Sequence, residues 1–284
     1  MSTFPIRLIV NADELGSTPE ITDGIVRAHH EGIVTSASIS GTAADLIDLK
    51  RRLATSPNLG LGGHLVLVGA APIRPPAEIP SLVNDNGLLL DSPTELLSRW
   101  VRGKLNVSHL HDELRAQTTR LLKAGFGLDH LDTYLQLGFL PPVADALERV
   151  AQELRIRTIR SAIEGPTLSW FADLKKGLPM AMLGAFGYLS RRRMGAIRHG
   201  AQSWGLAESG GLSATRFLEI LGRMGPGVHE LICHPGLEPQ ESLTLLGKRQ
   251  IFERRMELEV LCDPQTKSWL AQRGVELCRF KDVF

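Results

Sequence analysis

Hydrophobic and polar positions along this chain follow two alternating periods. Short apolar stretches rich in β-branched residues predict strands at residues 6–13, 33–40, 59–68, 128–137, 155–161 and 228–236, and a weaker one at 274–280. Apolar residues that recur every three or four positions predict helices at residues 17–32, 42–55, 92–102, 108–124, 141–155, 213–223 and 240–261. Strands that alternate with helices in this way predict a parallel sheet, either doubly wound or closed into a barrel.

The first strand and helix carry the clearest local signals. Thr18 before Pro19 is a typical helix start, because threonine caps free N–H groups and proline fits the first helical position. Gly32 is the expected stop of the same helix. No repeat or low-complexity linker divides the sequence, so we expect one domain over residues 1–284, with insertions at 69–91 and 162–212. In an α/β barrel, such insertions build or cover the active face.

Polar side chains gather where the predicted strands end. Asn11 and Asp13 share one face of the first strand because side chains alternate, and Glu14 begins the next loop. His64 lies in the third predicted strand. Since the carboxyl ends of parallel strands meet at one edge of the sheet, we expect these groups to lie together.

Two later strands add further polar residues. In the stretch 128–137, four residues are predicted to share a face that is too polar for an ordinary core: His130, Asp132, Tyr134 and Gln136. Glu230 and His234 share a face of the last clear strand, and Cys233 lies opposite, so Cys233 and His234 are not expected to act as a pair. Carboxylates and imidazoles together suit acid–base hydrolysis or a divalent cation.

Composition and charge indicate what kind of partner the protein has. The chain has 284 residues, 43% of them hydrophobic, and 32 Lys and Arg against 31 Asp and Glu leave a formal charge of +1. This balance argues against nucleic acid and favours a small molecule. Three cysteines without CxxC spacing argue against a disulfide framework and a structural zinc site, and predict reduced thiols in a cytoplasm.

Several common motifs are missing from the sequence. It contains no GxxxxGK[ST], GxGxxG, GxSxG or HExxH pattern, and no apolar run as long as the roughly 18 residues of a membrane span. One segment, 177–195, joins an apolar block to three arginines. It predicts either a core or insertion helix that ends in cations, or a surface that touches a membrane or an apolar ligand.

Five motifs, in the same order, are similar to those of the YdjC-like carbohydrate deacetylases, a family that includes chitooligosaccharide and hopanoid-associated deacetylases. NADELG resembles N-A-D-D-F-G, AHHEGIVTSASI resembles A-H-x-x-G-I-V-T-S-x-S-L, and LGLGGHLVLV resembles G-L-x-V-G-L-H-L-x-L. HLDTYLQLGFLPPV and ELICHPG resemble H-x-D-S-H-x-H-x-H-x-x-P-x-V and E-x-M-C-H-P-G. In addition to these five, WGLAESGGLS resembles the G-L-A-x-S-G stretch of the hopanoid-associated branch. The resemblance implies a distorted (β/α) barrel that removes an N-acetyl group from a sugar.

The resemblance also implies roles for single residues. In the family, the second acid of the opening motif and two histidines hold a divalent metal, and the first acid activates water. Asp13 matches that first acid, and His64 matches the first histidine. Glu14 stands in place of the ligating aspartate, and His234 matches a late histidine near the reaction centre.

Tyr134 departs from the family pattern, because it stands where the second histidine ligand is expected. A phenol titrates at about 10 and binds divalent ions poorly unless it is ionised. A catalytic zinc normally has three protein ligands and a water. Glu14 and His64 alone therefore predict a weak or absent site for Mg²⁺ or Zn²⁺.

Three hypotheses follow from this departure. In the first, the protein is a metal-dependent amidohydrolase in which Asp13 activates water, His234 protonates the leaving amine and Tyr134 donates to the oxyanion. In the second, the site is metal-free and performs acid–base chemistry on an intermediate of a specialised pathway. In the third, the protein binds a ligand without turnover.

The substrate is predicted to be a small molecule that contains a sugar or is hydrophobic. Five further residues are expected to contact it: Asn11, His130, Asp132, Arg160 and Glu230. Arg160 follows a predicted strand, where it either binds an anionic group or forms an ordinary ion pair. The family resemblance also implies a homodimer.

Overall fold

The computed structural model describes residues 5–160, 198–199, 201–205, 212–238 and 248–284, and a parallel sheet forms its centre. Within these residues the sheet has nine strands: β1 (Ile6–Leu15), β2 (Ser36–Ser40), β3 (Gly60–Leu65), β4 (His130–Thr133), β5 (Thr158–Ile159), β6 (Arg198–His199), β7 (Gln202–Trp204), β8 (Gly227–Cys233) and β9 (Val275–Leu277). Their order is β6-β5-β4-β3-β2-β1-β8-β7, and β9 pairs with the first half of β1.

Helices connect most of the strands. The described α-helices are α1 (Pro19–His30), α2 (Leu46–Arg52), α3 (Pro93–Val101), α4 (Val107–Lys123), α5 (Pro141–Glu153), α8 (Ala214–Arg223), α9 (Lys248–Cys262), α10 (Pro264–Gln272) and α11 (Phe280–Val283). Short 3₁₀ segments are η1 (Leu53–Thr55), η2 (Pro76–Glu78) and η3 (Tyr134–Phe139). None of the helices in the described part of the chain is long and apolar enough to cross a membrane.

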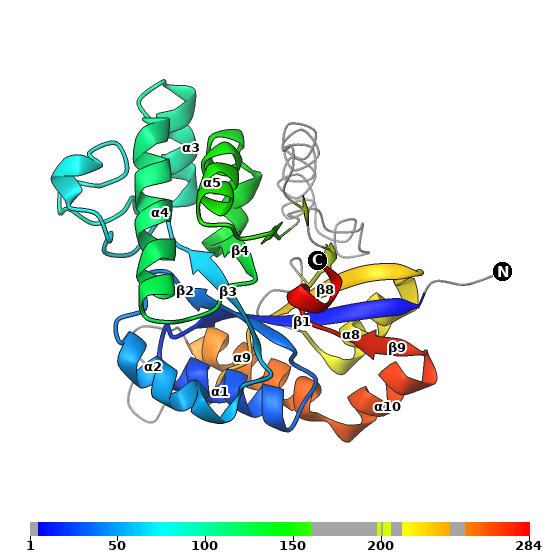
Figure 1. The fold of residues 1–284 in the computed structure, drawn as a ribbon. Helices are drawn as coiled ribbons and strands as arrows, with labels where there is room; N and C mark the ends of the chain where they lie inside the picture. Colours follow the sequence, from blue (N-terminus) through cyan, green and yellow to red (C-terminus); the bar gives the residue numbers. More distant parts are fainter. Residues whose placement is uncertain (1–4, 161–197, 200, 206–211, 239–247) are drawn as a thin grey trace.

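The sheet has the form of a distorted (β/α) barrel, as the family resemblance implied. The two ends of the strand order, β6 and β7, are consecutive in the chain and are separated only by residues 200 and 201. Because such close neighbours in the chain lie close in space, the sheet must curl round to bring its two ends together. Figure 1 shows the crossing strands and the helices around them.

The two larger apolar cores lie between the sheet and its helices. One packs α1, α8, α9 and α10 against the outer face of β1, where Leu8, Val10 and Ala12 are fully buried. The other packs α3, α4 and α5 against β3 and β4, around Leu65 and Leu131. Because the apolar residues of each strand face these helices, the alternate polar residues are left to face the inside of the barrel.

The local signals at the first helix are confirmed. The Thr18 hydroxyl accepts a hydrogen bond from the Ile21 N–H at 3.3 Å, and Pro19 takes the first helical position. The helix ends at His30, and at Gly32 a Cβ atom would lie 2.5 Å from the carbonyl oxygen of Leu261 on α9. A side chain does not fit there, so the glycine allows α1 and α9 to approach closely.

The strand predicted over residues 128–137 is too long. β4 ends at Thr133, and η3 follows with Leu135 and Gln136 in the left-handed region at φ 52° and 55°. The Thr133 hydroxyl accepts the Gly138 N–H at 2.7 Å and so turns the chain back toward α5. Gln136 therefore does not continue the polar face of β4.

Other differences concern the late part of the chain. The predicted insertion 162–212 contains β6 and β7, each too short to give a sequence pattern, and α10 was not predicted. The predicted insertion 69–91 is a loop with one 3₁₀ turn, anchored by Glu113 of α4, whose carboxylate accepts the N–H groups of Ile73 and Arg74, each at 2.9 Å. The predictions for 177–195 and for 240–247 lie outside the described residues.

Candidate functional site

The polar interior of the barrel brings together most of the residues that the sequence analysis selected. They come from several strands: Asn11 and Asp13 from β1, His64 from β3, His130 and Asp132 from β4, and Glu230 from β8. Arg160 directly follows β5, and its N–H continues the pairing with β4 through the carbonyl of Leu131 at 2.9 Å. All of these side chains are buried.

Asp13 is held by Arg160 through two parallel hydrogen bonds. Nη1 donates to Oδ2 at 2.7 Å, and Nη2 donates to Oδ1 at 2.5 Å. The same guanidinium lies 2.9 Å from Oδ2 of Asp132 and donates from Nε to Glu230 at 2.7 Å. One cation thus joins three carboxylates, and its planar fork fixes the orientation of Asp13.

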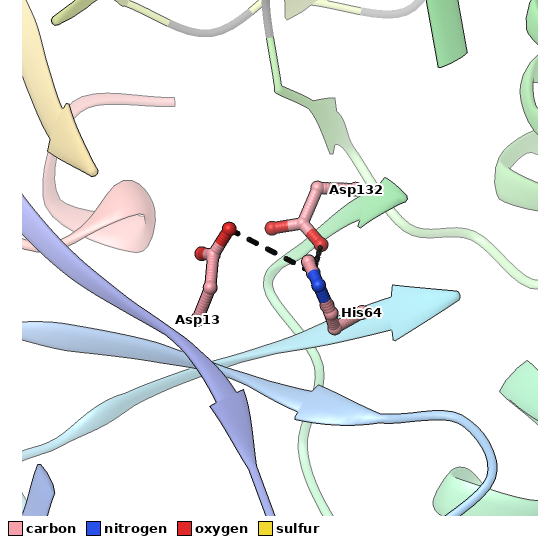
Figure 2. Close-up of side chains that lie close together, drawn as sticks. All are labelled: Asp13, His64 and Asp132. Atoms are coloured by element: carbon pink, nitrogen blue, oxygen red, sulfur yellow. Dashed lines mark hydrogen bonds and ion pairs between the residues drawn. The ribbon is translucent and has the colours of Figure 1, made fainter. Parts of the chain in front are cut away.

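His64 is bound to Asp132 on the neighbouring strand. Its Nδ1 lies 2.5 Å from Oδ1 of Asp132 and 3.9 Å from Oδ2 of Asp13. Figure 2 shows the three side chains turned toward one another from β1, β3 and β4. The register that pairs His64 with Asp132 across β3 and β4 places them side by side.

Ser38 of β2 connects the two halves of this cluster, and the sequence analysis missed it. Its hydroxyl donates to Oδ2 of Asp132 at 2.6 Å, receives the Asn11 amide at 2.8 Å and lies 3.0 Å from Nε2 of His130. The alternation of Ser36, Ser38 and Ser40 on one face of β2 was the available signal, but serine on a strand is too common to mark a site.

His130 lies at the far side of the interior from the strand ends. Its Nδ1 is 2.6 Å from Oδ1 of Asp129, and its ring stacks on Phe280 of α11 with centroids 3.8 Å apart. With both nitrogens bound and one ring face covered, His130 supports the cluster from below.

The charges of the interior shift the pKa values of its members. Burial would raise the pKa of the Asp13 carboxyl, but Arg160, helped by His64, outweighs burial and lowers it. The pKa of Asp132 is lowered against its burial in the same way, by Arg160 and His64. Burial would lower the pKa of His64, yet Asp132 and Asp13 raise it. Glu230 differs, because burial outweighs Arg160 and raises its pKa.

Glu14 is separated from this interior cluster, although it directly follows Asp13. Its backbone is left-handed, with φ at 70°, and its Oε2 accepts a hydrogen bond from Nη2 of Arg254 on α9 at 2.6 Å. Arg254 was not selected from the sequence, because nothing in a helical arginine 240 positions away from Glu14 signals the contact.

Tyr134 lies between the two groups of residues. Its ring meets the ring of His64 edge to face, with centroids 5.9 Å apart, and its side chain is half-buried. Burial raises the pKa of its phenol, the Glu14 carboxylate raises it further, and Arg254 opposes both. The hydroxyl is therefore a protonated hydrogen-bond donor at neutral pH.

His234 follows β8 and is half-buried. Since Cys233 pairs with Ala12, His234 continues at the level of Asp13 on the neighbouring strand. Its N–H donates to Glu257 of α9 at 2.5 Å. Cys233 faces the other way, donates to the carbonyl of Asn11 at 3.4 Å and has a pKa raised by burial, so it is not paired with His234.

One group of described residues, Asp13, His64 and Asp132, could hold a metal ion, because one ligand atom of each lies within 4.8 Å of the others. The present distances suit hydrogen bonds instead. Two ligands of one small divalent ion lie roughly 3 Å or more apart, since each is about 2 Å from the ion, whereas Nδ1 of His64 is 2.5 Å from Oδ1 of Asp132. Arg160 also occupies both oxygens of Asp13.

The residues that the resemblance assigns to a metal fit it no better. Glu14 is neutralised by Arg254, and Tyr134 is a protonated phenol in place of an imidazole. His64 can offer a nitrogen only if the other one keeps Asp132, an arrangement common for metal-bound histidines. The donor set in its present arrangement does not fit a tightly held divalent cation.

Comparison with known proteins gives matches along nearly the whole chain. The model of one protein family, described as YdjC-like protein, matches residues 7–272. A carbohydrate deacetylase of Geobacillus stearothermophilus is 29% identical over 288 residues, with 99% of each chain covered. A chitooligosaccharide deacetylase of Serratia marcescens is 28% identical, with 97% of this chain and 98% of the relative covered.

A solved structure shares the fold. The crystal structure of a proposed cellobiose-phosphate cleavage protein from Enterococcus faecalis V583 superposes with a TM-score of 0.79 at 23% sequence identity, and the match covers 98% of this chain and 99% of that one. At this level of identity the likeness concerns the fold alone.

Proposed function

Because the chain belongs to the YdjC-like protein family, we propose that it hydrolyses the amide bond of an N-acetyl group on a sugar-containing substrate and releases acetate. The names of relatives that match 97–99% of the chain support this reaction class. The observation that carries the proposal is the carboxylate of Asp13, which Arg160 holds in one orientation at the carboxyl end of β1.

Asp13 acts as the general base. Arg160 lowers the pKa of Asp13 against its burial, so the carboxylate is ionised at neutral pH, which is the form that accepts a proton. Arg160 uses one lone pair on each oxygen, and the Asn11 amide donates to Oδ1 at 2.9 Å, so one of about four such sites, on Oδ2, is left for a water molecule. Asp13 takes a proton from this water while the water oxygen forms a bond to the acetyl carbon.

Tyr134 and His234 complete the reaction. The protonated Tyr134 hydroxyl donates a hydrogen bond to the oxygen of the tetrahedral intermediate, where negative charge develops. When the carbon–nitrogen bond breaks, His234 gives a proton to the leaving amine, and the other product is acetate. One water is consumed: the proton that Asp13 received restores the proton of His234, and the acetic acid that forms releases its own proton to solvent as it becomes acetate.

Five further residues support the base. Asn11, His130, Asp132, Arg160 and Glu230 were predicted to contact the substrate, and each is at most 5% exposed and bonded to other members of the interior cluster. We assign them the role of holding Asp13 and His64 in place.

The proposed reaction has no metal step, because Glu14 is paired with Arg254 and Tyr134 is a protonated phenol in place of a histidine ligand. The predicted Mg²⁺ or Zn²⁺ at Glu14 and His64 is tested by elemental analysis of protein purified without chelator, and by melting with and without EDTA. A stoichiometric ion that stabilises the protein would refute the metal-free form of the reaction. The predicted homodimer is tested by light scattering.

The reaction is tested by release of acetate from N-acetylated chitooligosaccharides. We expect Asp13→Asn to lower kcat/KM by roughly 10²- to 10⁴-fold, because the amide cannot accept the proton of water. The matched control is Asp23→Asn on α1, which removes a carboxylate that pairs with Arg52 at the surface and should leave the rate unchanged. Equal rates for wild type and Asp13→Asn would refute the assignment of the base. Binding without acetate release would favour the non-catalytic hypothesis.

A further inference from the structure

The ion pair between Glu14 and Arg254 uses only part of the guanidinium. Nη2 of Arg254 donates to Oε2 of Glu14 at 2.6 Å. The Glu14 side chain is 17% exposed and that of Arg254 is 10% exposed. Nη1 of Arg254 is buried and has no hydrogen-bond partner among the described residues. A buried donor without a partner lowers stability, so packing alone does not account for this arginine.

The backbone around Arg254 fixes its place. The alkyl stem of Arg254 lies against Gly236, where a Cβ atom would be 3.3 Å from Cδ of the arginine. Gly236 also donates its N–H to the Arg254 carbonyl at 3.4 Å. One turn later on α9, Glu257 accepts the N–H of His234. Arg254 is thus built into the contact between α9 and the loop that carries His234.

The guanidinium reaches the residues that would otherwise bind a metal. Glu14 directly follows Asp13, and Tyr134 is close enough to both Glu14 and Arg254 for each to influence its phenol. The Tyr134 ring in turn contacts His64. A fixed positive charge therefore stands beside Glu14 and Tyr134, two of the three positions that the family resemblance assigns to metal ligands.

We propose that Arg254 is a built-in cation that occupies the Glu14 carboxylate and thereby keeps divalent metal ions weakly bound at this site. An ion at Glu14 and His64 would have to share the Glu14 carboxylate with the guanidinium and remain next to its positive charge. The positive charge that balances Glu14 thus comes from Arg254 and not from a metal ion. The proposal concerns which cation occupies Glu14, and it goes beyond the proposed reaction, since it holds whether or not acetate is released.

The experiment measures Zn²⁺ binding to the full chain by isothermal titration calorimetry, together with the zinc retained after dialysis. We expect Arg254→Met to bind Zn²⁺ roughly tenfold to a few hundredfold more tightly than wild type, because a positive charge beside the Glu14 carboxylate is removed. The matched control is Arg255→Met, which removes the same charge from the next position of α9, where the side chain is 44% exposed and pairs with Glu238. Its affinity should equal that of wild type.

A second pair of variants identifies the carboxylate. Glu14→Gln in the wild-type background should leave Zn²⁺ affinity unchanged, because Arg254 already occupies Glu14, and this result does not require Arg254→Met to fold. Glu14→Gln combined with Arg254→Met should cancel the gain. The proposal is overturned if Arg254→Met binds Zn²⁺ no more tightly than wild type, or if Glu14→Gln alone weakens binding tenfold. A gain that persists in the double variant also overturns it.

Discussion

Two arginines bind two consecutive acids at the end of β1, and they do so in different ways. Arg160 uses all three of its nitrogens, on Asp13, Asp132 and Glu230, in the fully buried interior. Arg254 uses one nitrogen on Glu14 and leaves another without a partner among the described residues. The saturated contact fixes the orientation of Asp13, whereas the single contact places a charge beside Glu14 and leaves part of the guanidinium unused.

Removal of Arg160 should have the largest effect on stability. Arg160→Met leaves three buried carboxylates without their cation, so we expect the free energy of unfolding to fall by about 3–5 kcal/mol. Arg160→Lys keeps the charge but loses the two parallel bonds to Asp13, and should lose less. Urea denaturation measures both variants. If Arg160→Met lost less stability than Arg160→Lys, the charges of the three carboxylates would have to be balanced by another group.

Loss of the Ser38 hydroxyl should have an intermediate effect. Ser38→Ala removes the common partner of Asn11, His130 and Asp132, and buried polar groups without partners cost about 1–3 kcal/mol. Ser40→Ala on the same strand is the control, because the single side-chain partner of its hydroxyl in the described part of the chain is that of Thr42, at 3.3 Å. Thermal unfolding compares them, and equal losses would contradict the central position of Ser38.

Removal of Arg254 should change stability little. Arg254→Met breaks one ion pair but also removes a buried donor without a partner, so we expect the free energy of unfolding to change by less than about 1 kcal/mol. The same urea denaturation applies. If Arg254→Met were as damaging as Arg160→Met, the two arginines would both be structural and the contrast between them would disappear.

The smallest expected effect is a pH dependence that originates from His64. Its pKa is raised in the folded protein, since Asp132 and Asp13 outweigh burial. Because the folded state binds the proton of His64 more tightly than the unfolded state, protonation of His64 stabilises the fold. This stabilisation is complete below the unfolded pKa of about 6.5 and is lost as pH rises through the raised pKa. Stability curves of wild type and His64→Asn between pH 6 and pH 9 should converge as pH rises. Parallel curves would show that the protonation of His64 does not contribute to stability in this pH range.

The alternation of side chains along the strands predicted much of the interior. Asn11 and Asp13 do share a face, His130 and Asp132 do face the inside, and Cys233 does lie opposite Glu230. A period of two residues determines the face wherever the strand is regular. The prediction failed at Gln136, where two non-glycine residues adopt left-handed backbone that no sequence pattern indicates.

The contacts between distant elements were beyond such patterns. Ser38 and Arg254 were missed because their roles depend on which strand or helix lies beside them. Arg160 was selected for its place after a strand, but its three carboxylate partners come from β1, β4 and β8. The period of a helix predicts which of its faces is buried, but not which element that face contacts. The pairing of Glu14 with Arg254 could therefore be found only from the three-dimensional structure.

The stacking of Phe280 on His130 has a consequence for how the chain is made. Phe280 covers the base of the barrel interior, and it is synthesised long after the strand that it covers. Domains generally fold as units during translation. A ribosome-bound chain that has completed β8 but has not yet emerged at Phe280 therefore lacks the ring that closes the floor of the interior, and the imidazole of His130 gains this cover only when α11 docks.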